Sequence, residues 1–519
     1  MKTETYELNC ADDVTFNNNA LFCVGTGRMN LALRHEYHNQ LEKVQNDIGF
    51  SYIRGHGLLC DDMGIYHSYE QDGGQRREYN FRYVDMVFDD YLSLKIKPFV
   101  EFGFMPAKLA SGDQTIFYWK GNVTPPSDYN KWAELIAAVV NHWIERYGAE
   151  EVASWLFEVW NEPNLKGFWK DADMEEYFKL YEVTSKTVKS CDPRLRVGGP
   201  AICGVDDERW LKCFLDYCSI NKTPLDFVTR HAYAAEMPEN IGHYAYQKLR
   251  EPLVFLTELK VSRQIIDSFP EYKGMEMHVT EFNTSYSPLN PIHDTNLNAA
   301  YVARLLSEMG DTCASYSYWT FGDVFEEAGV AFTPFSGCFG LLTNGMIPKP
   351  TYWAFSFFSK IGASARCFKR AIARNEKFIV TTDDKNNFRG IAWNITEETS
   401  EKDADILLDF SVNLEKGEYL FMKKLVDEKV CNPLKNWIDM GSPANPNEEQ
   451  LALLRECALP QTTTERIAVT ESAAKLQPQG KLNFKIPLSA NALVYFEIKR
   501  IIPETDRGFQ AERIRGAGN

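Results

Sequence analysis

The chain has 519 residues with a net charge of −16, and 44% of them are apolar, which is typical of a soluble globular protein with two or three domains. The acidic balance argues against nucleic acid as a partner, because phosphate binding needs a basic face. Since no run of about 18 apolar residues occurs, the sequence also predicts no membrane-spanning helix.

The N-terminal residues MKTETYELNCADDV lack an apolar stretch behind a basic start, so we expect no signal peptide. The 12 cysteines are scattered without the spacing of a disulfide framework or a zinc site. Neither an H-E-x-x-H pattern nor a close histidine pair suggests a catalytic metal. These features predict a cytoplasmic protein with reduced thiols and no metal.

From about residue 20 to 360, short apolar runs alternate with helical patterns such as those over 128–147 and 298–310. The strand-like runs, eight in all, are 22–26, 52–57, 96–104, 155–163, 195–204, 227–233, 275–283 and 314–321. This alternation predicts a (β/α)₈ TIM barrel, an α/β fold, over 15–360. A doubly wound sheet is the alternative, but after the first strand it has only the weak G-x-G of CVGTGRMN (23–30) as a phosphate loop.

After residue 365 the chain consists of short β-prone runs separated by turn residues. These runs are 378–384, 388–395, 405–412, 418–426, 481–488 and 491–500. They predict an antiparallel β domain over 361–500. We expect a partly helical insertion near 431–470, with a helix over 447–457, and a polar C-terminal tail at 501–519.

A glutamate stands where a buried run ends, in FEVWNEPN (157–164). Pro163 removes a backbone donor and favours an extended conformation of Glu162, so the strand stops there. Glu281 ends the seventh run in the same way, in HVTEFN (278–283). Because α/β barrels place their chemistry at the carboxyl ends of the strands, the two glutamates form a candidate pair across the barrel.

Two carboxylates at one face suit glycoside hydrolysis, in which one delivers a proton and the other attacks the anomeric carbon or activates water. A separation of about 5.5 Å means retention of configuration and one of roughly 6.5–9.5 Å means inversion, a choice the sequence leaves open. Asn161 fits the need for an amide at the sugar 2-hydroxyl. The charge of an ionised Glu281 is expected to raise the pKa of Glu162.

Seven segments taken together resemble glycoside hydrolase family 39, chiefly its bacterial β-xylosidases. They are YIRGHGLL (52–59), TIFYWKGNVTPP (115–126), FEVWNEPNLKGFW (157–169), RHAYA (230–234), HVTEFNTSY (278–286), YWTFGDVFEE (318–327) and IPKPTYWAF (347–355). The resemblance runs from about residue 20 to 360 and continues more weakly beyond. One departure is FSGCFGL (335–341), where Ser336 and Cys338 replace a His and a Gly of many relatives.

The resemblance implies a retaining mechanism, with Glu162 as the acid/base and Glu281 as the nucleophile. It also implies that Arg54 and His56 contact the ring hydroxyls of the sugar, and that Phe117 lies at the pocket wall. The alternative for Arg54 and His56 is a cluster of charges at the barrel floor.

Further site residues follow from the same resemblance. His231 and Tyr233 on the sixth strand, together with Tyr286, would orient the nucleophile and contact the sugar. Trp319 would form the platform under the ring, and Glu326 would accept a hydroxyl. Two other strand glutamates, Glu101 and Glu158, are interpreted as buried structural carboxylates that need a cationic partner such as Arg54.

We therefore expect an exo-acting β-xylosidase that needs no cofactor and releases xylose from the non-reducing ends of short xylooligosaccharides. The resemblance implies that a strand near residues 3–9 completes a β-sandwich formed by 1–14 and 361–500, and that the protein is a homotetramer. The alternatives are an α-L-iduronidase, for which Arg54 could bind the substrate carboxylate, an α-L-arabinosidase, or a non-catalytic sugar-binding protein. Intact Asn161, Glu162 and Glu281 argue against the last.

Overall fold

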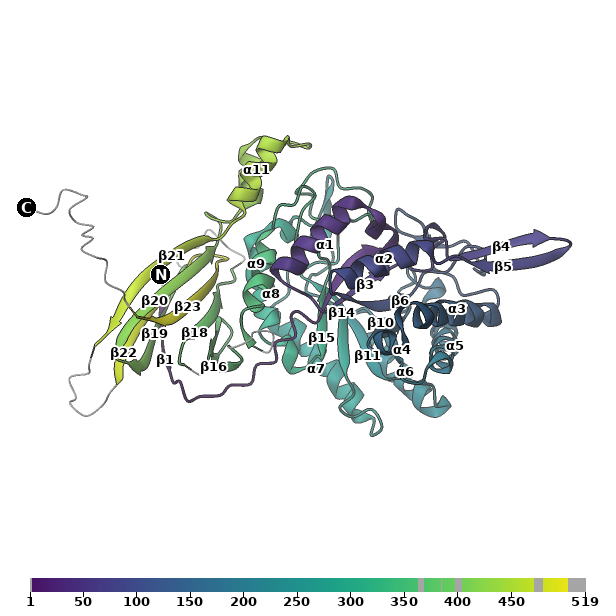
Figure 1. Ribbon diagram of the computed structural model, residues 1–519, viewed down its shortest axis with the longest axis horizontal. Coiled ribbons are helices and arrows are strands. Elements are labelled where there is room, and N and C mark those ends of the chain that lie inside the picture. Colours follow the sequence, from purple (N-terminus) through teal and green to yellow (C-terminus); the bar gives the residue numbers. More distant parts are fainter. Residues whose placement is uncertain (1, 363–367, 384, 397–403, 471–478, 503–519) are drawn as a thin grey trace, which may run out of the picture.

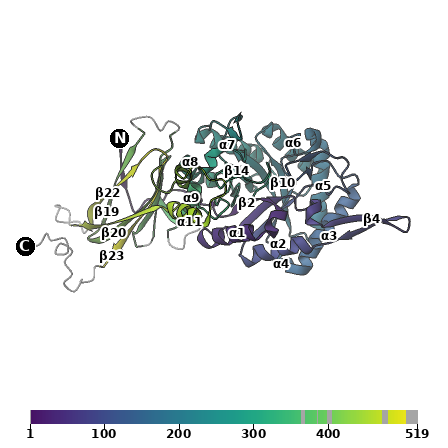
Figure 2. The ribbon, with the colours of Figure 1, turned by 90° about the horizontal axis from the view of Figure 1, so that it is seen from above.

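The computed structural model describes residues 2–362, 368–383, 385–396, 404–470 and 479–502. Residues 503–519 of the predicted tail therefore lie outside the described residues. The molecule is elongated, with a helix-covered barrel at one end and two β-sheets at the other (Figure 1). A view from above shows the same two parts side by side along the long axis (Figure 2).

Eight parallel strands close into a barrel, which confirms the predicted TIM fold. In chain order, they are β2 (Cys23–Arg28), β3 (Tyr52–His56), β6 (Lys97–Phe102), β9 (Leu156–Val159), β10 (Arg196–Ile202), β11 (Phe227–Tyr233), β14 (Met277–Asn283) and β15 (Ser315–Tyr318). The last strand pairs with the first, with Ser317 opposite Cys23. An open doubly wound sheet has no such closing pair, so that alternative is wrong.

Helices surround the barrel on its outside (Figure 2). The α-helices of this part are α1 (His35–Asp47), α2 (Arg82–Ser93), α3 (Tyr129–Tyr147), α4 (Ala149–Val152), α5 (Met174–Cys191), α6 (Asp207–Asn221), α7 (Pro252–Ser268), α8 (Asn296–Leu306) and α9 (Pro350–Phe358). Short 3-10 helices are η1 (Met29–Leu33), η2 (Asp61–Met63), η3 (Lys170–Ala172), η4 (Pro291–Asp294) and η5 (Met309–Asp311). Helix α3 confirms the pattern over 128–147, and the Asp128 side chain caps it by accepting from the backbone N–H groups of Asn130 and Lys131.

The G-x-G of the first strand has a packing role. A Cβ atom on Gly25 would lie 2.5 Å from the Trp319 ring, and one on Gly27 would lie 3.0 Å from Phe325. The two glycines therefore make room for the segment that follows β15. This close approach accounts for a motif that would otherwise suggest a phosphate loop.

Three small hairpins interrupt the barrel and were not predicted, because their sequences are short or polar. They are β4 (Tyr66–Gln71) with β5 (Gly74–Tyr79), β7 (Thr115–Ile116) with β8 (Gly121–Asn122), and β12 (Glu239–Ile241) with β13 (Tyr244–Tyr246). The β4–β5 hairpin projects from the end of the molecule farthest from the β-sheets (Figure 1).

The second part is a sandwich of a three-stranded sheet, β1-β19-β22, and a six-stranded sheet, β16-β17-β18-β23-β20-β21. Its strands are β1 (Lys2–Leu8), β16 (Arg370–Arg374), β17 (Phe378–Thr382), β18 (Phe388–Trp393), β19 (Ile406–Glu415), β20 (Gly417–Val426), β21 (Gln461–Val469), β22 (Gln479–Leu488) and β23 (Leu493–Ile501). Phe410 and Phe484 of the first sheet pack in one buried cluster with Phe378 and Phe496 of the second.

The strand expected near residues 3–9 is confirmed as β1, which pairs with β19. The pairing is parallel, so the smaller sheet is mixed rather than wholly antiparallel. Strands β16 and β21 were not predicted, and β21 lies within the segment expected to be partly helical.

The helical insertion consists of α10 (Pro433–Asp439) and α11 (Glu448–Cys457). Asn447 begins α11 with a reciprocal capping box to Gln450, which confirms the helix predicted over 447–457. Trp437 and Leu454 of the insertion pack in one buried cluster with Phe335. The insertion thus supports the barrel segment that carries Ser336 and Cys338.

Candidate active site

The chain turns sharply between the end of β9 and Glu162. Trp160 and Glu162 have φ angles of 72° and 46°, in the left-handed region that residues other than glycine rarely adopt. The expectation that Pro163 keeps Glu162 extended is therefore wrong. The backbone N–H of Glu162 donates to the carbonyl of Ala201 on β10 at 2.9 Å, so tertiary contacts hold a conformation that the local sequence disfavours.

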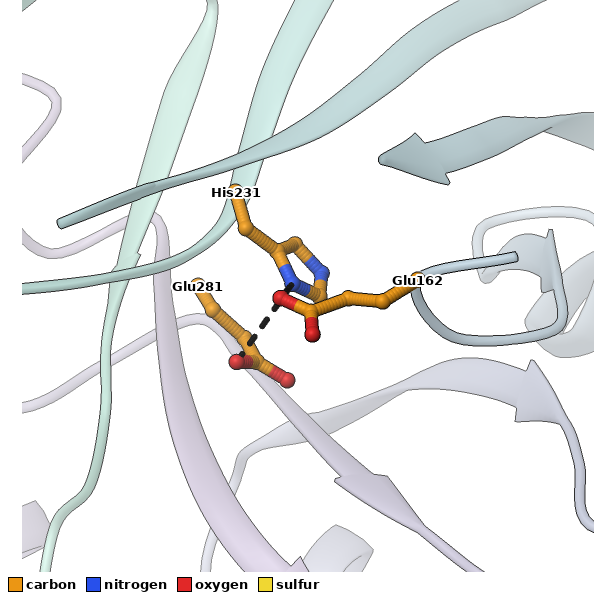
Figure 3. A group of neighbouring side chains, drawn as sticks. All are labelled: Glu162, His231 and Glu281. Atoms are coloured by element: carbon orange, nitrogen blue, oxygen red, sulfur yellow. Dashed lines mark hydrogen bonds and ion pairs between the residues drawn. The ribbon is translucent and has the colours of Figure 1, made fainter. Parts of the chain in front are cut away.

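Glu162 and Glu281 face one another at the carboxyl ends of β9 and β14, with His231 of β11 beside them (Figure 3). The Nδ1 atom of His231 lies 2.8 Å from Oε1 of Glu162 and 3.4 Å from Oε2 of Glu281. One oxygen from each carboxyl group and this ring nitrogen lie within 4.8 Å of one another. The barrel thus brings the predicted pair together.

The surroundings of Glu162 and Glu281 shift the pKa values of the two carboxyl groups to different extents. Burial, followed by the negative charge of Glu281, raises the pKa of Glu162 well above its ordinary value. Burial also raises the pKa of Glu281, but the positive charge of Arg54 opposes this effect. Burial and then nearby cations hold the pKa of His231 well below its usual range, so this imidazole is neutral. The site therefore presents a proton-bearing acid next to a carboxylate.

Both oxygens of Glu281 are held in place. Arg54 donates from Nη1 to Oε1 at 2.6 Å, and the Tyr233 hydroxyl donates to Oε2 at 2.7 Å. The sequence analysis assigned Tyr233 this orienting role. It assigned Arg54 a sugar contact instead.

Arg54 lies at the barrel floor, with a side chain that is 0% exposed. Its Nε donates to Glu158 at 2.7 Å, and its Nη2 lies 2.9 Å from Glu101 and donates to the Asn161 amide oxygen at 2.9 Å. Each guanidinium nitrogen is thus already bonded, so Arg54 orders the carboxylates and is not available to the sugar. The interpretation of Glu101 and Glu158 as buried partners of Arg54 is borne out by these contacts.

His56 and aromatic rings form one wall of the site. The Nε2 atom of His56 lies 3.3 Å from Oε1 of Glu281, and its ring is 4.7 Å from Trp319 and 6.0 Å from Phe117, between centroids. Trp319 also rests against Gly25. The predicted wall and platform residues therefore lie next to His56, which in turn lies beside the nucleophile.

The two adjacent acids Glu326 and Glu327 have different surroundings. Glu326 is paired with Arg28 at 3.0 Å and with Arg34 at 2.5 Å, away from the carboxylate pair. Glu327 lies 3.8 Å from Nε2 of His56, and burial, then the charges of Glu281 and Glu162, raise its pKa well above the ordinary value. Sequence reasoning singled out Glu326 and missed Glu327, because adjacent positions in a loop carry no periodic signal for which one points inward.

Tyr286 and the segment FSGCFGL (335–341), which departs from the family pattern, differ in their exposure. Tyr286 is 40% exposed; its hydroxyl is 3.5 Å from the Met237 sulfur and its ring 6.3 Å from that of Tyr233, so it is not brought to Glu281. Ser336 and Cys338 are buried and line a cavity of about 20 Å³ together with His243 and Phe332.

Two carboxylates and a histidine nitrogen are also a donor set that can hold a metal ion. In the described residues, however, these atoms are engaged by Arg54, Tyr233 and one another. A metal cation placed among them would also meet the guanidinium charge of Arg54. The arrangement fits proton transfer and nucleophilic attack better than metal binding.

Comparisons with known proteins agree with this geometry. A family model described as "Glycosyl hydrolases family 39" matches residues 10–474. A β-xylosidase of Geobacillus stearothermophilus is 49% identical over 497 residues, covering 94% of each chain. A β-xylosidase of Caldicellulosiruptor saccharolyticus is 36% identical over 442 residues, covering 83% of this chain and 86% of the relative. The crystal structure of a monomeric β-xylosidase from Caulobacter crescentus CB15 superposes with a TM-score of 0.85 at 30% identity, covering 96% of this chain and 100% of the other.

Proposed function

The chain belongs to glycoside hydrolase family 39, and from this premise we propose that it is a retaining β-xylosidase that removes single xylose units from the non-reducing ends of short xylooligosaccharides. One observation carries the mechanism: oxygens of Glu162 and Glu281 lie within 4.8 Å of one another. This spacing suits the gap of about 5–5.5 Å in retaining enzymes, whereas inversion needs roughly 6.5–9.5 Å. The two curated β-xylosidases support the choice of sugar.

In the first half of the proposed reaction, a carboxylate oxygen of Glu281 attacks the anomeric carbon. The bond from that carbon to the leaving oxygen breaks, and Glu162 gives its proton to that oxygen. Burial and the charge of Glu281 keep this proton on Glu162 before the attack. Arg54 and Tyr233 hold the nucleophile in position.

In the second half, water hydrolyses the ester between Glu281 and the sugar. Because esterification removes the negative charge of Glu281, the second cause of the raised pKa of Glu162 disappears. Glu162 then ionises more readily and takes a proton from the attacking water. The two substitutions at the anomeric carbon leave its configuration unchanged.

We assign the contact with sugar hydroxyls to Glu327 and the platform under the ring to Trp319, whereas His56 faces Glu281 with its Nε2 atom. Glu327 replaces Glu326 in this proposal, because its carboxyl group lies beside His56 whereas that of Glu326 is occupied by Arg28 and Arg34. Glu326 then anchors the segment from which Glu327 points inward.

A uronic acid substrate is disfavoured. Human α-L-iduronidase is 31% identical to this chain over 128 residues, 24% of the chain and 18% of the relative. An enzyme of that kind must neutralise a substrate carboxylate. Arg54, the cation considered for this purpose, is fully buried and bonded to Glu101, Glu158 and Glu281.

We also propose cytoplasmic location and homotetrameric assembly, both of which rest on the sequence and the family resemblance. Among the described helices, none has the length and apolar character needed to cross a bilayer. One solved relative is described as monomeric, so assembly needs a direct measurement. Light scattering of the tetramer would give four times the 59.5 kDa of one chain, and a value near a single chain overturns this part of the proposal.

The central test compares wild type with Glu281→Ala on nitrophenyl β-xyloside, α-arabinoside, β-glucoside and a uronide. We expect the β-xyloside to be cleaved fastest and the variant to lose roughly 10⁴-fold or more in kcat. Proton NMR of the released sugar should detect β-xylose before mutarotation. A preferred uronide, or α-xylose released first, would overturn the proposed substrate or stereochemistry.

A further inference from the structure

Glu101 is a buried acid that the proposed mechanism does not use. It lies near the carboxyl end of β6, and its side chain is 0% exposed. Its Oε2 atom lies 2.7 Å from Nδ1 of His56 and 2.9 Å from Nη2 of Arg54. Its Oε1 atom is buried and has no hydrogen-bond partner among the described residues. On its other nitrogen, His56 lies 3.3 Å from Oε1 of Glu281.

We propose that Glu101 is a positioning residue: it keeps a proton on the oxygen that faces His56 and thereby holds the imidazole in the tautomer with hydrogen on Nε2, from which His56 donates to Glu281. The tautomer follows from the contacts of these side chains. Its catalytic meaning rests on the proposed function, in which Glu281 is the nucleophile.

Several acids crowd around the single cation Arg54. Glu101, Glu158 and Glu281 contact its guanidinium group directly. Glu162 and Glu327 add two carboxyl groups whose pKa is raised by burial and by the charge of Glu281. Since one guanidinium cannot neutralise all of these groups in a dry barrel, some must stay protonated.

Glu101 is well placed to be one of the protonated groups. Burial raises its pKa to about 8, although the positive charge of Arg54 acts in the opposite direction. The neighbouring imidazole supplies no further cation, because burial holds the pKa of His56 at about 3.

The surroundings of the two Glu101 oxygens decide which of them carries the proton. A hydroxyl at Oε1 would be a buried donor without an acceptor, which is unfavourable. At Oε2 the proton points to Nδ1 of His56, 2.7 Å away, a distance typical of a short hydrogen bond. Nδ1 then accepts, so the ring hydrogen of the neutral imidazole is on Nε2.

The contacts of the other ring nitrogen of His56 favour the same tautomer. A bare Nε2 would direct its lone pair toward Oε1 of Glu281 at 3.3 Å and toward Oε1 of Glu327 at 3.8 Å. A hydrogen on Nε2 converts the closer of these contacts into a donation to the nucleophile carboxylate. Glu101 thus acts on Glu281 through His56.

The proposal predicts a switch at alkaline pH. When Glu101 ionises, one proton leaves the Glu101–His56 pair for solvent, and the proton that remains moves to Nδ1, where it donates to the new carboxylate. Nε2 is then bare, and Glu281 loses a donor. Below the pKa of about 8 the Nε2–H form dominates, and above it the Nδ1–H form dominates.

Nitrogen NMR of the full-length protein labelled with ¹⁵N-histidine tests this inference, because the two ring nitrogens have different chemical shifts when bare and when protonated. The signals of His56 among the 9 histidines are assigned by their loss in His56→Asn. We expect a protonated Nε2 at pH 6 and a transfer to Nδ1 on passing about pH 8. A wild-type His56 that carries its hydrogen on Nδ1 at pH 6 overturns the proposal without any variant.

Glu101→Gln provides the sharper comparison, because a glutamine amide can donate to Nδ1 but cannot ionise. The variant should keep the Nε2–H tautomer across the whole pH range. Glu158→Gln is the matched control, since Glu158 also binds Arg54 and is buried but bonds to Thr280 instead of His56. The control should retain the switch, and its loss in both variants would assign the effect to the whole cluster and reject the role of Glu101.

These spectra do not depend on turnover, so the proposed function and the proposed role of Glu101 can be rejected independently of one another. If no glycoside is cleaved but His56 switches as described, the function is wrong and the assignment of the tautomer stands. If β-xyloside is cleaved but His56 does not switch, the function stands and the role of Glu101 falls.

Discussion

Glu162 combines a strained backbone with a raised pKa, and both effects arise from neighbours distant in sequence. Its φ angle is 46°, and its Oε1 atom lies 2.8 Å from Nδ1 of His231. Burial and the charge of Glu281 then favour its protonated form. An acid of this kind determines how activity changes with pH.

We expect kcat/KM to fall at low pH as Glu281 becomes protonated and at high pH as Glu162 loses its proton. Because the pKa values of Glu281 and Glu162 are both raised, both limbs of the profile should lie at higher pH than the titration of ordinary carboxyl groups. The shift should be larger for the high-pH limb, which belongs to Glu162. Glu162→Gln cannot ionise, so its high-pH limb should disappear in profiles measured with an aryl xyloside whose leaving group needs no protonation. An unchanged limb in the variant would remove Glu162 from the role of acid.

The difference between Glu326 and Glu327 gives a second test on neighbouring residues. Glu327→Gln should lower kcat/KM for the β-xyloside about 10- to 200-fold, as expected when a hydrogen bond to a charged or acidic group worth about 1.5–3 kcal/mol is weakened. Glu326→Gln is the control, because its carboxyl group binds Arg28 and Arg34. It should reduce kcat/KM less. The reverse order in steady-state kinetics would restore Glu326 as the sugar ligand.

At the scale of elements, the segment after β15 forms one wall of the site by packing against the first strand. Trp319 packs against both the His56 ring and Gly25. Ion pairs also hold the segment, because the buried Lys349 pairs with Asp323 of this segment at 2.8 Å and with Asp294 at 2.7 Å. Its position therefore depends on contacts that a strand or helix pattern does not encode.

Gly25→Ala tests this packing. The new methyl group would lie 2.5 Å from Trp319, so the ring must move, at an expected cost of about 1–3 kcal/mol in the free energy of unfolding. We expect a lower melting temperature and a raised KM for the β-xyloside, measured by calorimetry and kinetics. Gly204→Ala is the matched control, since its Cβ would meet no atom within 4 Å. Equal effects of the two changes would contradict the packing argument.

At the scale of the whole molecule, the chain builds the sandwich from both of its ends. Strand β1 pairs with β19, the chain then passes to the barrel, and the remaining sandwich strands follow α9 (Figure 1). The Tyr6 ring of β1 is 4.7 Å from Phe378 and 5.6 Å from Phe410, so the first strand also contributes to the core between the sheets.

Tyr6→Ala should therefore destabilise the sandwich without reaching the active site. Loss of this half-buried ring should cost about 1–3 kcal/mol and lower the first calorimetric transition, while kcat/KM below that transition stays unchanged. Thr5→Ala, on the exposed face of the same strand, is the control and should leave the transition in place. A loss of activity at temperatures where Tyr6→Ala remains folded would indicate coupling between the two parts.

The residue sequence alone predicts the elements with strong local signals. The eight barrel strands, helix α3 and helix α11 all follow from the pattern of apolar residues along the chain. The pair Glu162 and Glu281 could be found in the same way, because each stands at the carboxyl end of an apolar run and parallel strands place such ends at one face.

Other features needed the tertiary structure. The left-handed Glu162, the full engagement of Arg54, the inward direction of Glu327 and the parallel pairing of β1 each depend on partners more than 35 residues away in the sequence. Local propensity reports what a residue favours among its sequence neighbours. Side-chain direction in a loop, burial and charge coupling are properties of the space that the closed barrel encloses, so they are decided only when the strands have assembled.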